Sequence, residues 1–161
     1  IVRDLDLLKG CKNLIVSISV NTLDEQFKSD MDQASSIGKR LETLETLHEN
    51  GIYTVLFMSP IFPGVTDYKK IIEKTRRYVD EYWFENLNLR GSYKQDILGY
   101  IKNAYPQLGE LYDDIYVKKN RNFWNNLSAD IEEYCGIHSI KHINYFYHKE
   151  LVDAKLSQGG H

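Results

Sequence analysis

The sequence is poor in cysteine and proline, and it contains no long apolar run. Its 161 residues include only two cysteines, Cys11 and Cys135, and three prolines. Two cysteines are too few for a disulfide-stapled scaffold, which favours a reducing compartment, and neither CxxC nor CxxxCxxC occurs. No apolar stretch reaches the roughly 18–20 residues of a membrane-spanning helix. We therefore expect a cytoplasmic protein with no membrane partner.

An excess of charge of one sign is also missing. Lys and Arg total 20 against 23 for Asp and Glu, which gives a formal net charge of −3. That balance provides no general attraction to nucleic acid or to an anionic membrane. The first residues, Ile1-Val2-Arg3-Asp4, lack the apolar segment of a signal peptide, and the chain does not begin with Met. We expect either a processed start or a piece of a longer protein.

What the sequence does contain is an alternation of strand-like and helical segments. Apolar, β-rich runs predict strands over residues 13–21, 52–59, 82–89 and 143–147. Apolar residues at helical spacing predict helices over about 37–50, 67–79, 92–104 and 123–136. Strands that alternate with helices of this length indicate right-handed βαβ units and a parallel sheet. The predicted fold class is therefore α/β.

In parallel sheets of this kind, ligands bind at the carboxyl ends of the strands. The residues that fall at these ends are Ser19 and Asn21, Ser59 and Pro60, and Asn88 and Arg90. Ser19 and Asn21 are two positions apart, so their side chains share one face of the strand. A hydroxyl and an amide suit ribose hydroxyls or an amino-acid head group. The alternative is that the pair only ends the strand and begins a turn.

Two further features adjoin these strand ends. Arg40 comes early in the helix after the first strand, where its guanidinium could hold a carboxylate with two hydrogen bonds. The alternative is a solvated arginine on the helix surface. The loop over residues 58–67 is apolar and contains two of the three prolines. It either packs a ligand ring or simply connects strand to helix, with Asp67 as the helix cap.

Other polar groups carry weaker signals. His138, His142 and His148 lie close in sequence, but no Asp or Glu falls between the last two, and we expect a solvated strand edge instead of a metal site. The basic run over residues 118–121 is interpreted as solvated surface in preference to a nucleic-acid contact. Glu85 is the only carboxylate inside a predicted strand, and it is expected at mid-strand, so an acid–base pair at the strand ends has little support.

Five short motifs, in order and at consistent spacing, resemble the second half of radical S-adenosylmethionine proteins. A strand ends in Ser-x-Asn, the next helix begins with Arg-Leu, and the next strand leads into Ser-Pro-x-x-Pro-Gly-x-x-Asp. The motifs span residues 19–24, 39–42, 47–52, 59–67 and 84–90. Within the superfamily, the pattern is similar to relatives of spore photoproduct lyase. The resemblance covers about residues 1–95.

This resemblance implies a partial parallel (β/α) barrel. The strands over residues 13–21, 52–59 and 82–89 would be strands four to six of a (β/α)6 barrel, so residues 1–95 would form its C-terminal half. Residues 96–161 would add C-terminal helices and a final strand to the same compact unit. The CxxxCxxC loop that holds the 4Fe–4S cluster in such proteins is absent from this sequence.

The resemblance also implies cofactors and residue roles. The full-length protein would bind S-adenosylmethionine and a 4Fe–4S cluster and would cleave the former to a 5′-deoxyadenosyl radical, which abstracts hydrogen from an unknown substrate. Neither group is expected to bind this chain alone, which should be inactive. Ser19 and Asn21 would lie near the ribose and methionine parts, and Arg40 would pair with the carboxylate. Ser59 and Pro60 would line the adenine or ribose side. Asn88 and Arg90 would face the substrate. No residue of this chain is assigned as catalytic or as a metal ligand.

Two other functions stay open: a stand-alone, non-catalytic α/β binding module, and another barrel enzyme such as a hydrolase or isomerase. The first would keep the shape without the chemistry, and the second would need an acid–base pair at the strand ends. A half-barrel also leaves one sheet edge without a partner strand. We expect either a homo-oligomer formed through that edge or an N-terminal segment that covers it.

Overall fold

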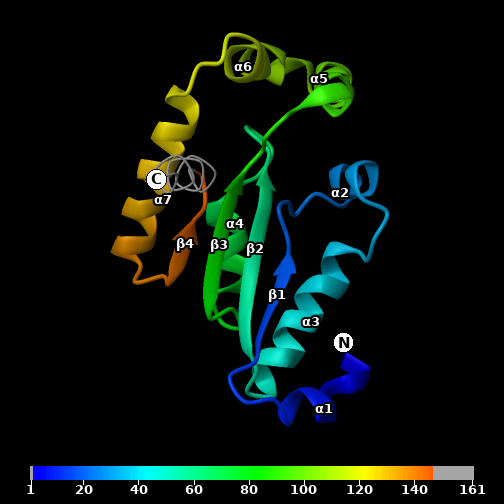
Figure 1. Cartoon of the computed structure of the whole chain (residues 1–161), viewed down its shortest axis with the longest axis vertical. Coiled ribbons are helices and arrows are strands. Elements are labelled where there is room, and N and C mark those ends of the chain that lie inside the picture. The colour runs from blue at the N-terminus through cyan, green and yellow to red at the C-terminus, as the bar shows by residue number, and fades with distance from the viewer. Residues whose placement is uncertain (1, 147–161) are drawn as a thin grey trace, which may run out of the picture.

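The computed structural model describes residues 2–146, which fold around a four-stranded parallel sheet (Figure 1). Its strands are β1 (Ile15–Ser19), β2 (Tyr53–Ile61), β3 (Glu81–Asn86) and β4 (His142–Asn144). Their order in the sheet, β1-β2-β3-β4, is also their order in the chain. Each connection therefore crosses to the adjacent strand, as in one part of a (β/α) barrel. The predicted fold class, a parallel α/β sheet consistent with a partial barrel, is confirmed.

The helices fall before, between and after these strands. The chain begins with the 3₁₀ turn η1 (Val2–Asp4) and α1 (Leu5–Lys9). Helices α2 (Glu25–Met31) and α3 (Ile37–Glu49) join β1 to β2, and α4 (Tyr68–Thr75) joins β2 to β3. The longer link from β3 to β4 consists of α5 (Gly91–Ala104), η2 (Pro106–Leu108), α6 (Gly109–Tyr112), the π-helical η3 (Asp113–Val117) and α7 (Asn122–Ile137). Within residues 2–146, no helix is long and apolar enough to span a membrane.

Local sequence sets where the helices begin and end. The side chains of Asp24, Ser36 and Asp67 accept hydrogen bonds from backbone N–H groups in the first turns of α2, α3 and α4. Helix α3 ends at Glu49, and Gly51 follows with a left-handed φ of 75°. The predicted end of this helix at Asn50-Gly51 is thus confirmed, and so is the predicted cap at Asp67. The sequence did not predict α2.

Strand ends differ more from prediction. β1 begins at Ile15 instead of residue 13, because Asn13 has a left-handed φ of 59°, which a strand does not accommodate. β2 continues through the cis Ser59–Pro60 peptide bond to Ile61, and its register with β3 shifts between Met58 and Ile61. β3 ends at Asn86, not at residue 89, and β4 covers only His142–Asn144. Residue 147, the end of the last predicted strand, lies outside the described residues.

The two faces of the sheet have different surroundings. On one face, side chains such as Leu56, Met58 and Phe84 are fully buried in a core shared with α3, α4 and α7. In Figure 1, α4 lies directly behind β2 and β3. The side chains that alternate with these point to the opposite face. Phe57 and Trp83, on that opposite face, are not part of the core cluster. We call the face that carries Phe57 and Trp83 the inner face, since a closed barrel would enclose it.

Candidate functional site

Three aromatic rings dominate the middle of the inner face. Phe57 and Trp83 are paired across β2 and β3, and Tyr145 follows β4. Each pair of rings meets edge to face, with centroids 5.8 Å apart for Phe57–Trp83, 6.2 Å for Phe57–Tyr145 and 6.0 Å for Trp83–Tyr145. The three side chains are half-buried. They form a rigid apolar floor below the carboxyl ends of the strands.

Above this floor, a hydroxyl at the carboxyl end of β2 contacts a carboxylate at the carboxyl end of β3. The Ser59 hydroxyl donates a hydrogen bond to Oε2 of Glu85. Glu85 is half-buried and lies one residue before the end of β3. The sequence reasoning assigned Glu85 to mid-strand, and this was wrong because β3 stops at Asn86 instead of running to residue 89. The sequence signal that identifies it is its alternation with Trp83, which places both side chains on the inner face.

Asn21 and Pro60, both predicted as ligand residues, contact each other. The Asn21 side-chain amide donates a hydrogen bond of 2.9 Å to the carbonyl of Pro60. This bond ties the chain after β1 to the end of β2. The structure therefore brings these two predicted residues together and gives the amide a positioning role, since it fixes the spacing of the two strand ends.

Arg40, predicted to hold a carboxylate, lies beside the open edge of β1. Its Nη1 donates to the Ser19 carbonyl at 2.9 Å, and its Nε donates to the Ser35 carbonyl at 3.0 Å. Its Nη2 pairs with the carboxylate of Asp32. The backbone N–H of Ala34 and then the Arg40 guanidinium hold the pKa of Asp32 below its ordinary value. A carboxylate from this chain thus occupies the partner position that the sequence assigned to a ligand.

The surroundings of this pair are open to a ligand. Ser17, Ser19, Arg40 and Asp32 line a hollow of about 970 Å³ along β1. The side chain of Asp32 is 46% exposed, so an incoming carboxylate could displace it without first opening the core. Arg3 lines the same hollow. The N-terminal η1 contacts α3 on this side of the molecule. Homo-oligomer formation through the edge of β1 stays a prediction.

Asn88 and Arg90, predicted to face a substrate, lie apart from the other predicted residues. Both are exposed, and both line a separate cavity of about 670 Å³ beyond β3. Its other walls come from α5, η3, the first turn of α7 with the link before it, and Phe146. The predicted residues therefore form two groups. Ser19, Asn21, Arg40, Ser59 and Pro60 gather at the ends of β1 and β2, and Asn88 with Arg90 belongs to the second cavity.

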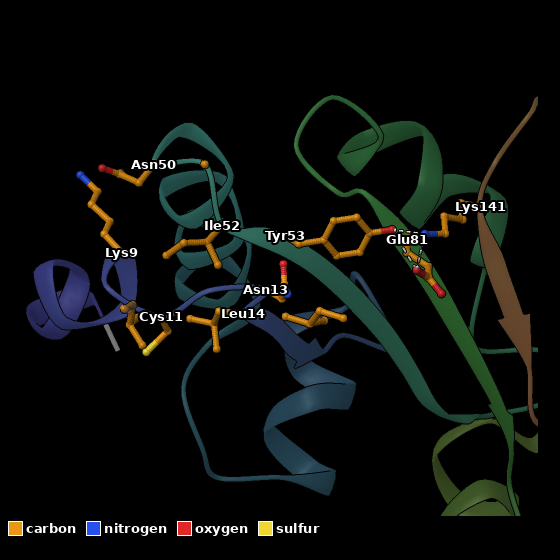
Figure 2. Close-up of a pocket in the computed structure, with 12 residues that line it drawn as sticks. Lys9, Cys11, Asn13, Leu14, Asn50, Ile52, Tyr53, Glu81 and Lys141 are labelled. Atoms are coloured by element: carbon orange, nitrogen blue, oxygen red, sulfur yellow. Dashed lines mark hydrogen bonds and ion pairs between the residues drawn. The ribbon is translucent and has the colours of Figure 1, made fainter.

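The amino ends of the strands carry a third cavity, of about 520 Å³, which Figure 2 shows with Cys11, Tyr53, Glu81 and Lys141 at its walls. Glu81 is 8% exposed and accepts hydrogen bonds of 2.9 Å from both the Tyr53 hydroxyl and the Trp83 indole. Lys141 Nζ lies 3.3 Å from the same carboxylate. Burial raises the pKa of Glu81, but these three partners outweigh it and leave the pKa below its ordinary value. In barrels, the amino ends of the strands contribute to stability, and this satisfied network fits that role.

Within residues 2–146, no three His, Cys, Asp or Glu side chains lie together in a group that could hold a metal ion. Cys11 is exposed, whereas Cys135 is buried within α7. His142 binds Glu132 through Nε2 at 2.8 Å, and its Nδ1 lies 3.1 Å from the Ile140 carbonyl. Both ring nitrogens of this histidine are therefore engaged within the chain. His148 lies outside the described residues.

Comparison with known proteins finds one similar protein and one matching family model. An uncharacterized protein of Methanocaldococcus jannaschii is 36% identical to this chain over 112 residues, which make up 69% of this chain and 42% of that protein. The chain thus matches less than half the length of this relative. No solved structure matches the chain. The family model of the radical SAM superfamily matches residues 1–79, the segment that runs from η1 through β1, α3 and β2 to the end of α4.

Proposed function

We propose that this chain is the C-terminal half of a radical S-adenosylmethionine barrel and supplies one side of its cofactor site. The observation that carries the proposal is the coincidence of two findings. The superfamily match covers the β1–α4 units, and those units bring Ser19, Arg40 and Ser59 to the carboxyl ends of the strands. There the Ser59 hydroxyl meets Glu85 of β3, just beyond the matched segment. The narrower assignment to the spore photoproduct lyase-like group rests on the order of the sequence motifs and forms part of the proposal.

The side chains at this edge suit S-adenosylmethionine. Glu85 already accepts a hydrogen bond from the Ser59 hydroxyl, so the same carboxylate can accept one from a ribose hydroxyl. Ser59 and Pro60 would line the ribose or adenine side. Ser19, whose side chain is exposed, would face the methionine part together with Asn21. Arg40 would hold the cofactor's carboxylate by exchanging it for Asp32.

The residues of this chain do not suit a 4Fe–4S cluster. Such clusters are held by several cysteine thiolates, and the sequence contains two cysteines, one of them buried. Residues 2–146 also provide no other group of three candidate ligands. The cluster of the full-length protein would therefore be bound by residues outside this chain. We accordingly propose that the chain alone binds neither cofactor and is inactive.

Within the whole protein, this chain would orient its ligands and exclude water. S-adenosylmethionine, when bound at a cluster, supplies radical chemistry that removes a hydrogen atom from a substrate. The Phe57–Trp83–Tyr145 floor would keep water from the reacting centre. Glu85 would fix the sugar by accepting its hydroxyl protons in hydrogen bonds, and Asn21 would maintain the spacing of the β1 and β2 ends.

The test uses the longer protein to which this sequence belongs. Its reading frame should encode CxxxCxxC upstream of residue 1. After anaerobic cluster reconstitution and reduction with dithionite, the protein should release 5′-deoxyadenosine from S-adenosylmethionine, as measured by mass spectrometry. Absence of the motif, or of the product in a protein with a full cluster, would refute the proposal and favour a non-catalytic binding module.

A variant of Glu85 in the same full-length protein tests the role of this carboxylate directly. Glu85→Gln should weaken S-adenosylmethionine binding by about tenfold, because a charge-assisted hydrogen bond becomes a neutral one. Glu73→Gln is the matched control, since Glu73 is exposed on α4, away from the strand ends. Calorimetry of the two variants would show equal affinities if Glu85 had no part in the site.

A further inference from the structure

The cavity beyond β3 gathers positive charge from distant parts of the sequence. Arg90, Lys94, Lys119 and Arg121 all line it, and among residues 2–146 its lining includes no Asp or Glu. Arg90 precedes α5, Lys94 lies in its first turn, and the other two come from the link between η3 and α7. We call this cavity the basic pocket. The sequence interpretation of residues 118–121 as solvated surface did not include Arg90 and Lys94, which the fold brings to the same place.

Internal hydrogen bonds hold the walls of the basic pocket in position. Lys94 Nζ donates to the Tyr116 carbonyl at 2.6 Å, and the Tyr116 hydroxyl donates to the Leu87 carbonyl at 2.9 Å. Asn120 donates from its side chain to Asp114 at 2.7 Å, which fixes the loop that carries Lys119. These bonds use one donor of Lys94, and no carboxylate among the described walls of the pocket compensates its charge.

The floor of the basic pocket is apolar. Leu87, Ile115, Trp124 and Phe146 line it, and each is less than 9% exposed. The rings of Trp124 and Phe146 meet edge to face with centroids 5.3 Å apart. An apolar floor below several cations suits a ligand with an anionic group and an apolar or ring-shaped body. The volume, about 670 Å³, falls within the range of small-molecule sites.

We infer that the basic pocket binds a phosphate group carried by a small molecule with an apolar or ring-shaped body. The like charges of Arg90, Lys94 and Lys119 converge in one cavity, and an anion bound between them would offset their mutual repulsion. An extended nucleic acid needs a basic surface that continues along its backbone, whereas this chain has a net charge of −3 and these cations share one cavity. Phosphate binds arginine and lysine as a multiply charged acceptor.

The inference deepens the proposed function, because it names the class of substrate that would bind next to the proposed cofactor site. Leu87–Arg90 follow β3 directly, so the basic pocket begins where the Glu85 side of the cofactor site ends. Its identification as the substrate site rests on the proposed function. The binding itself does not, since it needs neither S-adenosylmethionine nor a cluster.

Calorimetry of the 161-residue chain at low ionic strength tests the inference, with inorganic phosphate, phenyl phosphate and a single-stranded oligonucleotide as probes. Phenyl phosphate should bind more tightly than inorganic phosphate, because only its ring contacts the apolar floor. Arg90→Ala/Lys119→Ala should weaken phenyl phosphate by at least about tenfold through the loss of charged donors. Both residues are exposed, so the fold should be retained, which circular dichroism would verify.

The control is Lys74→Ala/Arg77→Ala, which removes two exposed cations on and just after α4 and so changes the net charge equally. It should alter phosphate affinity by less than twofold. Absence of phosphate binding, an equal loss in both double variants, or tighter binding of the oligonucleotide than of phenyl phosphate would each overturn the inference. Cofactor cleavage by the longer protein distinguishes the two proposals. Its failure contradicts the proposed function, while loss of phosphate binding alone contradicts only the basic pocket.

Discussion

Replacing Glu81 with glutamine should destabilise the fold while leaving its shape intact. The carboxylate is nearly enclosed, and it accepts from Tyr53 and Trp83 at 2.9 Å each. An amide of the same size offers one oxygen and turns an NH₂ group toward the other donor. Hydrogen bonds to charged groups contribute about 1.5–3 kcal/mol each, and we expect a loss of one such bond, about 1.5–3 kcal/mol. The Lys141 pair adds little, because that side chain is 66% exposed.

The same substitution should change how stability depends on pH. The partners of Glu81 keep its pKa in the folded state below the ordinary value of 4.5, so the unfolded chain takes up the proton first as pH falls. The wild type therefore has the full contribution of Glu81 above about pH 4.5. It loses that contribution as pH falls toward the lower, folded-state pKa. Glu81→Gln has no titrating group at this position, so its stability should decline less over that interval.

Urea unfolding, followed by far-ultraviolet circular dichroism at a series of pH values, measures both effects. Glu73→Gln serves as the control because Glu73 is exposed, and it should match the wild type at every pH. Lys141→Ala should cost less than Glu81→Gln. The reasoning fails if Glu81→Gln unfolds at the wild-type urea concentration at neutral pH, or if the two stability curves stay parallel through the acidic range.

Three further predictions follow from burial and from ion pairing. Leu44→Ala removes a fully buried side chain from α3 and should cost about 2–5 kcal/mol in urea unfolding, while Leu7→Ala, at a side chain 74% exposed, should stay within about 0.5 kcal/mol. A thiol reagent should modify Cys11 rapidly and Cys135 only on unfolding, because Cys135 is 1% exposed and burial raises its pKa to about 11; two fast thiols in the folded chain would contradict this. Under the proposed function, Asp32→Asn should tighten S-adenosylmethionine binding by the full-length protein up to about fivefold, since it removes the internal carboxylate that competes for the guanidinium. Calorimetry that shows weaker binding would count against the exchange.

The elements that could be predicted from the sequence are those fixed by local rules. Helix α3 combines regularly spaced leucines, a serine cap and a terminal Asn-Gly, so both of its ends followed from neighbouring residues. β2 is a continuous apolar run because helices cover one of its faces and aromatic rings occupy the other. Each of these signals lies within a few residues of the feature it determines.

The parts of the site that could not be predicted depend on distant partners. The last ladder contact between β2 and β3 joins Ile61 to Asn86, and this pairing places Glu85 at the edge instead of mid-strand. The partner of Arg40 is Asp32, which lies in an irregular connection without periodicity. The convergence of Arg90 with Lys119 depends on the path of three short elements, η2, α6 and η3, between α5 and α7. No local pattern in the sequence specifies such a path.

The order of the strands has a consequence for how the chain acquires its structure. Because β1, β2, β3 and β4 are neighbours in the same sequence as they leave the ribosome, each new strand meets an edge that is already formed. None must be inserted between two strands that have paired, so loop closure is limited to one crossover at a time. We expect the sheet to grow from β1 outward during synthesis, with the long α5–α7 crossover before β4 as the last and slowest closure.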